Sequence, residues 1–120
     1  MEKLTSKEEE VMELIWQLGL CAPKDVAALY PTPQPSPNAI AQVFQALEKK
    51  EFLTHEPKGR GFVYRPIVDK RAYGRGRLSS VINRFFGDSY MSVVSALVQE
   101  EKVTEAELLQ YLADLKRKEN

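Results

Sequence analysis

The sequence holds one cysteine, one histidine and one tryptophan in 120 residues. A single cysteine excludes an internal disulfide and any cysteine-rich zinc finger. We expect Cys21 to be a small buried thiol in a connection between helices, with a reactive sensor thiol as the alternative. No second histidine or suitably spaced carboxylate accompanies His55, so a metal site or general base is not expected there. Because nucleophile elbows, phosphate-binding glycine loops and paired catalytic acids are also absent, the sequence predicts no enzyme and no cofactor.

Long apolar runs are absent too, and none approaches the length needed to cross a bilayer. The opening segment, MEKLTSKEEE, is acidic and lacks the apolar core of a signal peptide, so we expect a cytoplasmic protein. Neither sign of charge is in excess, since 17 Lys and Arg balance 17 Asp and Glu. The distribution is uneven, however, because residues 51–87 carry eight Lys or Arg against three Asp or Glu. Contact with phosphate groups needs such a local basic segment more than it needs a high net charge.

Apolar residues recur at helical spacing through the first half of the chain. The spacing predicts a first helix from Ser6 to Leu18, where both Thr5 and Ser6 offer a capping box. A short second helix is predicted over residues 23–30, and a third over residues 37–50. Four prolines in residues 31–37 cannot form a helix or a strand ladder, so this stretch reads as a stiff loop between the two helices.

Two short strands are predicted directly after the third helix, over residues 52–56 and 62–65. They flank the turn Pro57-Lys58-Gly59-Arg60-Gly61, which is cationic and rich in glycine. A helix followed at once by such a hairpin is typical of a winged helix-turn-helix, which places the helix in the major groove and the hairpin beside the DNA backbone. We therefore predict a mainly α fold with a small β-hairpin (α+β), with a winged-helix DNA-binding domain over residues 1–68.

The third helix and the hairpin supply the candidate DNA contacts. Amide side chains on the exposed helix face can pair with adenine edges, whereas an alanine can touch only a thymine methyl group. Cations at the helix end and at the hairpin tip suit phosphate contact, and the neighbouring glycines let the backbone approach a groove closely. The alternative is a merely solvated helix face and a charged turn. The candidate DNA-binding residues are Asn38, Ala41, Gln42, Gln45, Lys49, Lys58 and Arg60.

Residues 69–120 are predicted to form a helical dimerisation domain. Helices are expected over residues 70–86, 89–101 and 104–116, and their apolar content is large for about 50 residues, a size that seldom folds alone. Two copies packed about a two-fold axis would share one core. The alternative is that these helices fold back on the first domain. The candidate dimer-interface residues are Leu78, Ile82, Phe85, Phe86, Val94, Leu97, Val98, Leu108 and Leu112.

Five segments in order resemble one known family: Glu9-Glu10-Val11-Met12-Glu13-Leu14-Ile15-Trp16, Asn38-Ala39-Ile40-Ala41, Leu47-Glu48-Lys49-Lys50-Glu51-Phe52-Leu53, Tyr64-Arg65-Pro66 and Arg84-Phe85-Phe86-Gly87. From about Leu4 to Leu115 the chain resembles the penicillinase-repressor family of winged-helix transcriptional regulators. The resemblance implies a dimeric bacterial repressor that binds a dyad operator upstream of antibiotic-resistance genes. It also implies a membrane sensor-peptidase pathway as a partner, since many members are relieved when that pathway leads to cleavage in the dimerisation domain.

The chain departs from this family in two places. The recognition helix of characterised members carries threonine and arginine where this chain has alanine and glutamine at residues 39, 41, 42, 45 and 46. We therefore expect a different operator and weaker base contact in each half-site. Characterised members are cut at an Asn-Phe bond, and the corresponding place here is Ala96-Leu97, so the sequence does not predict induction by that cleavage. The alternative function is a winged-helix protein-interaction module, favoured by zero net charge and an arginine-free third helix.

Overall fold

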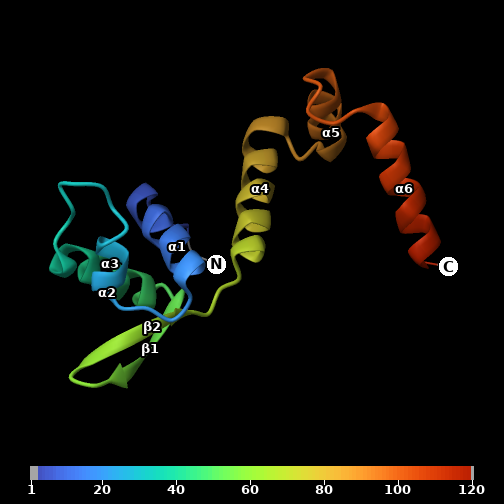
Figure 1. Ribbon diagram of the computed structural model, residues 1–120. Helices are drawn as coiled ribbons and strands as arrows, with labels where there is room; N and C mark the ends of the chain where they lie inside the picture. Colours follow the sequence, from blue (N-terminus) through green and yellow to red (C-terminus); the bar gives the residue numbers. More distant parts are fainter. Residues whose placement is uncertain (1–2, 120) are drawn as a thin grey trace. The chain divides into compact units, whose positions relative to one another are not determined.

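The structure is a computed structural model and describes residues 3–119. Its elements in order are α1 (Ser6–Leu18), α2 (Pro23–Ala27), α3 (Pro37–Lys49), β1 (Leu53–Lys58), β2 (Gly61–Pro66), α4 (Lys70–Phe86), α5 (Tyr90–Gln99) and α6 (Glu105–Glu119) (Figure 1). The predicted fold class, mainly helical with a small antiparallel hairpin, is confirmed. The chain divides into two compact units between Gly76 and Arg77. The domain boundary expected after residue 68 stays a prediction.

A capping box starts α1 and selects between the two caps that the sequence offers. The Oγ1 atom of Thr5 accepts a hydrogen bond from the backbone N–H of Glu8 at 3.1 Å. The Oε1 atom of Glu8 accepts one from the backbone N–H of Thr5 at 2.8 Å. Thr5 is therefore the N-cap and Ser6 is the first helical residue. The helix ends at Gly19, whose φ of 76° lies in the region that favours glycine.

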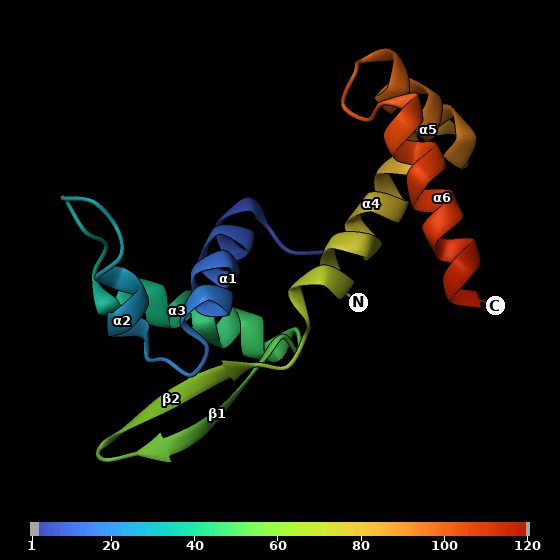
Figure 2. The ribbon, with the colours of Figure 1, turned by 45° about the vertical axis from the view of Figure 1, so that its right-hand side comes forward.

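The second helix is shorter than the sequence indicates. It ends at Ala27, and residues 28–30 form a turn, whereas we predicted helix as far as Tyr30. Two local effects explain the difference. The residue before Pro31 is disfavoured in helical geometry, and the side-chain amide of Gln34 donates to the carbonyls of Ala28 and Tyr30 at 3.2 and 3.1 Å. The proline-rich stretch that follows is the loop we expected, and it reaches away from α2 and α3 (Figure 2).

The core of the first unit lies between α1, α3 and the base of the hairpin. Phe44 of α3 meets Tyr64 of β2 edge to face, with ring centroids 5.0 Å apart. Tyr73, in the first turns of α4, packs on Phe52 and Trp16 at 5.5 and 6.1 Å. The start of α4 therefore belongs to the winged-helix core. The buried residues of this core are Leu4, Val11, Met12, Ile15, Cys21, Val26, Ala27, Ile40, Phe44, Leu47, Phe52, Leu53, Tyr64 and Tyr73.

The hairpin is anchored at its base and exposed at its tip. Its strands pair in register from Leu53 opposite Pro66 to Lys58 opposite Gly61, so both are longer than predicted. At the base, Cys21 and Tyr64 exchange two backbone hydrogen bonds of 2.9 and 2.7 Å, which join the α1–α2 connection to β2. Cys21 is only 3% exposed, so the expected buried thiol is confirmed.

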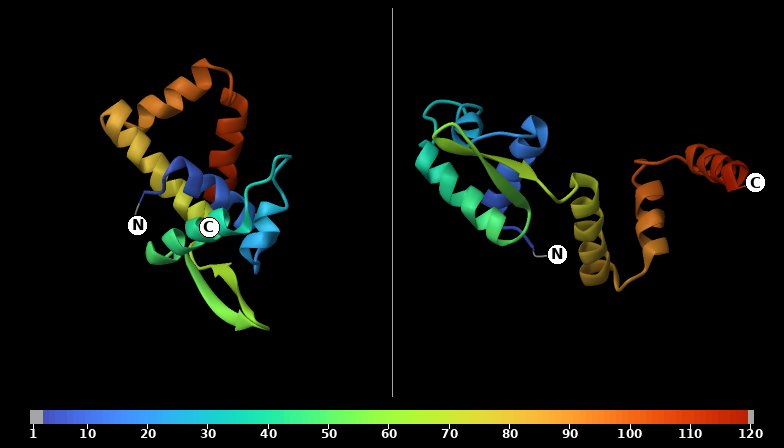
Figure 3. Two further views of the ribbon diagram at one scale, coloured as in Figure 1. Left: turned by 90° about the vertical axis from the view of Figure 1, so that its left-hand side faces the viewer. Right: turned by 90° about the horizontal axis from the view of Figure 1, so that it is seen from below.

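The second unit contains the end of α4 together with α5 and α6. Short connections join these helices (Figure 3). Ser89 caps α5 by accepting from the backbone N–H of Ser92 at 3.2 Å. A capping box of Thr104 with Glu107 starts α6. The glycines at residues 74 and 76 do not interrupt α4, which is continuous from Lys70 to Phe86. Among residues 3–119, no helix combines the length and apolar character that crossing a membrane requires.

Candidate nucleic-acid interface

Helix α3 presents one apolar and one polar face, as its sequence period dictates. Ile40, Phe44 and Leu47 point into the core and are fully buried. Ser36 caps the helix by accepting from the backbone N–H of Ala39 at 3.1 Å. The exposed side carries four of the predicted contact residues, which we call the reading face: Asn38, Gln42, Gln45 and Lys49.

The reading-face amides are free to bind a partner. Within residues 3–119, the side chains of Asn38, Gln42 and Gln45 form no hydrogen bond. Exposed amides with unused donors and acceptors can bind base edges in a major groove at little cost in lost internal bonds. Ala41 is half-buried at the flank of this face.

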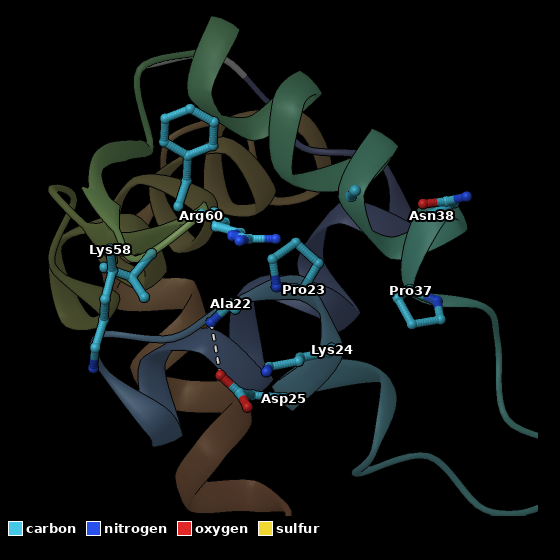
Figure 4. Close-up of a pocket in the computed structure, with 12 residues that line it drawn as sticks. Ala22, Pro23, Lys24, Asp25, Pro37, Asn38, Lys58 and Arg60 are labelled. Atoms are coloured by element: carbon cyan, nitrogen blue, oxygen red, sulfur yellow. Dashed lines mark hydrogen bonds between the residues drawn. The ribbon is translucent and has the colours of Figure 1, made fainter.

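A hollow of about 700 Å³ lies beside the reading face, between α2, α3 and the hairpin. Lys24 of α2 and Lys58 and Arg60 of the hairpin tip line it together with Asn38 and Ala41. Figure 4 shows Asn38 and Lys58 on opposite sides of this hollow. Two of the predicted contact groups, the start of α3 and the hairpin tip, therefore border one concave surface.

The three cations of this hollow are not used inside the protein. None of Lys24, Lys58 and Arg60 forms an ion pair with another residue in the range 3–119. The one carboxylate in the lining, Asp25, accepts from the backbone N–H of Ala22 at 2.8 Å, as Figure 4 shows. Because unpaired cations beside exposed amides favour a partner with repeated negative charge, this surface suits a nucleic-acid backbone.

Other cations of the first unit are paired with carboxylates. Lys70 lies 2.7 Å from Glu13, which ties the start of α4 to α1. Arg65 lies 3.7 Å from Glu56 across the hairpin. The basic segment seen in the sequence thus contains two paired cations, Arg65 and Lys70, and two unpaired cations at the hollow, Lys58 and Arg60.

The hairpin tip has the backbone geometry that close approach to a groove requires. Gly59 adopts a φ of 62°, which a side chain would strain. Phe62, just beyond the turn, leaves 53% of its surface exposed. Its ring meets that of His55 edge to face at 5.0 Å, so two aromatic side chains stiffen the strands below the tip.

Two features of this surface escaped the sequence analysis. Lys24 reaches the hollow from α2, and only the packing of α2 beside the hairpin reveals it. We also expected no carboxylate near His55, and that was wrong: its Nδ1 lies 2.5 Å from Oε2 of Glu48. Glu48 and His55 are seven residues apart, at a helix end and on a strand, and no local sequence pattern predicts a contact at that spacing.

The predicted dimer-interface residues fall into three groups. Leu78, Phe85 and Leu112 are well exposed, with 69% of Phe85 open to solvent, and Phe86 and Leu97 are exposed to a smaller extent. The residues of the second group, which are half-buried, are Val94, Val98 and Leu108. Ile82 differs from both groups, because it is already buried within the single chain and only 3% exposed.

A three-helix unit with an exposed third helix and a following hairpin defines a winged helix-turn-helix, a class of DNA-binding transcriptional regulators. The family model described as penicillinase repressor matches residues 4–117. The chain belongs to the penicillinase-repressor family, whose members are transcriptional regulators and not enzymes.

Two relatives and one solved structure resemble the chain. The penicillinase repressor of Bacillus licheniformis is 30% identical over 107 residues, which cover 88% of this chain and 84% of that protein. An uncharacterized 16.5 kDa protein of Latilactobacillus sakei is 27% identical over 109 residues, or 90% and 75% of the two chains. An ArsR-like transcriptional regulator from Rhodococcus sp. RHA1 shares 22% identity with a TM-score of 0.40, over 76% of this chain and 80% of that one. The last likeness is too weak to add to the family assignment.

Proposed function

We propose that the protein is a cytoplasmic, homodimeric repressor that binds a dyad operator through α3 and the hairpin. Asn38, Gln42 and Gln45 would contact base edges, with Ala41 close to a base. Lys49, Lys58 and Arg60 would contact phosphates. The observation that carries the proposal is the hollow, where unpaired cations from two elements border the free polar face of α3.

Dimerisation is proposed from the second unit. Large apolar side chains remain exposed on α4, α5 and α6. In a soluble protein, a contiguous exposed apolar surface marks an interaction site. A second copy of the chain would cover them about a two-fold axis. Two α3 helices would then enter successive major grooves about 34 Å apart, and bound repressor would exclude polymerase from the promoter. Antibiotic-resistance genes are the targets that family membership suggests, with a membrane sensor-peptidase pathway as a candidate source of the signal.

Selection of bound sequences from a random duplex pool at near-physiological salt tests the proposal. We expect enrichment of a dyad whose half-sites are about one helical turn apart, or a multiple of it. Sedimentation of the free protein should give the mass of a dimer. A Phe85→Glu variant, with a charge in the exposed apolar surface, should sediment as a monomer and bind the dyad far more weakly. The matched control is Tyr90→Phe, which keeps an exposed aromatic ring in the same unit.

Two results would contradict the proposal. A folded dimer that enriches no sequence and binds duplex DNA without salt dependence would favour a protein-interaction module instead. Enrichment of single half-sites by a monomer would remove the dimer while keeping the DNA contact surface.

A further inference from the structure

A side-chain hydrogen bond joins the end of α3 to the hairpin. The Nδ1 atom of His55, on β1, lies 2.5 Å from Oε2 of Glu48, in the last turn of α3. Because a carboxylate can only accept, the imidazole Nδ1–H donates. The ring of His55 is held in turn, at 5.0 Å from Phe62 and 5.4 Å from Tyr64. The direction of the Glu48 side chain is therefore set by the hairpin.

Glu48 is the sole acidic residue of α3. It follows Gln45 by three positions, which places the two side chains as neighbours on the helix surface. It also precedes Lys49, the cation of the reading face. A carboxylate free to turn toward the DNA would repel the phosphates and lower the affinity. If it reached a base edge, it would accept a hydrogen bond from the N4 amino group of cytosine.

The electrostatic surroundings agree with a carboxylate turned to the hairpin. The pKa of Tyr64 is raised, first by burial of its hydroxyl and second by the charge of Glu48. Side-chain exposure is 31% for Glu48 and 41% for His55, so the pair is accessible to solvent and not locked in the core. Loss of either partner therefore need not unfold the domain.

We propose that His55 is a positioning residue for DNA binding. It holds the Glu48 carboxylate against the hairpin, which keeps negative charge off the reading face and keeps cytosine out of the preferred half-site. The inference rests on the proposed function, because it concerns how the same surface meets DNA.

Three variants separate this role from simple packing. His55→Phe keeps an aromatic ring against Phe62 and Tyr64 but cannot hold Glu48. Glu48→Asp leaves the hairpin untouched and shortens the side chain by one methylene, so that its carboxylate no longer reaches the Nδ1 atom of His55. Both should bind the selected operator about tenfold more weakly at low salt, because a released carboxylate repels phosphates. The double variant His55→Phe/Glu48→Gln, with no charge to release, should recover wild-type affinity. Glu105→Asp, an exposed residue at the start of α6, is the matched control.

Base preference gives a second readout that packing alone would not change. Selection with His55→Phe should admit cytosine at one position of the half-site, and the double variant should lose that change. If the wild-type protein binds its operator, two results would overturn the inference. One is wild-type affinity in both His55→Phe and Glu48→Asp. The other is a double variant that binds the operator as weakly as His55→Phe does. A wild-type protein that binds no duplex would overturn the proposed function and this inference with it.

Discussion

The Nζ atom of Lys50 lies 2.6 Å from Oε1 of Glu8, so an ion pair joins the end of α3 to the first turn of α1. The same carboxylate oxygen accepts the backbone N–H of Thr5 and completes the capping box. Burial alone would raise the pKa of Glu8. The hydrogen bonds from Lys50 and Thr5 and the charge of Lys50 outweigh burial, so the pKa lies below its ordinary value of 4.5.

Glu8→Gln should lower the free energy of unfolding at neutral pH by about 1.5–3 kcal/mol, the range for hydrogen bonds to charged groups. Because the folded pKa is depressed, this stability is present above the ordinary pKa and is lost as the pH falls through the folded value. The difference between wild type and variant should therefore shrink in acid. Urea unfolding followed by fluorescence of the single tryptophan, Trp16, at pH 7 and pH 3 measures it. Glu9→Gln, in the same turn, is the control, and an equal loss there would contradict the assignment.

The Cys21 thiol should resist modification in the folded protein. Burial, and second the charge of Asp25, raise its pKa to about 11, and only the thiolate reacts. A thiol reagent such as DTNB at pH 8 should label Cys21 no faster than the protein unfolds, and at once in denaturant. Rapid labelling without denaturant would show that the α1–α2 connection opens away from β2.

The contacts of Tyr73 indicate that the stably folded winged-helix domain extends past the hairpin into the start of α4. Its hydroxyl accepts the backbone N–H of Leu4 at 3.4 Å, and its ring packs on Phe52. Tyr73→Ala should destabilise the domain by about 3–5 kcal/mol, as is usual for a buried aromatic residue. A fragment ending at residue 76 should unfold cooperatively, whereas one ending at residue 68 should lose most of that stability. Equal melting temperatures for the two fragments would support the boundary after residue 68.

Backbone and base contacts should separate in binding experiments. Changing Lys24, Lys58 or Arg60 to alanine should weaken binding to all sequences alike and reduce the salt slope by about one for each phosphate that is no longer neutralised. Gln42→Ala and Gln45→Ala should instead alter the preference among sequences. Fluorescence anisotropy over a salt series and a panel of operator variants measures both effects. Arg65→Ala is the control, since Arg65 faces Glu56; unselective loss from every variant would contradict the separate roles.

Local signals allowed much of the first unit to be predicted from the sequence. The bounds of α1, its capping box and the hairpin follow from residues within a few positions of one another. The reading face of α3 was predictable because helical period alone separates it from Ile40 and Phe44. The contributions of Lys24 and Tyr73 were missed because each depends on packing between elements distant in the sequence. The end of α2 was missed because the N–H groups of Leu29 and Tyr30 bond carbonyls three residues back, which makes a turn, and Gln34 holds that turn from outside the helix.

The backbone bonds between Cys21 and Tyr64 hold the hairpin at its base, while residues 56–61 are exposed. The tip can therefore gain, lose or exchange residues without any change in the core. Since base preference would reside on α3 and general affinity on the tip, the two properties are open to separate evolution. A chimaera of this chain that carries the hairpin tip of another family member should still prefer the operator of this chain, and should bind it with a different affinity.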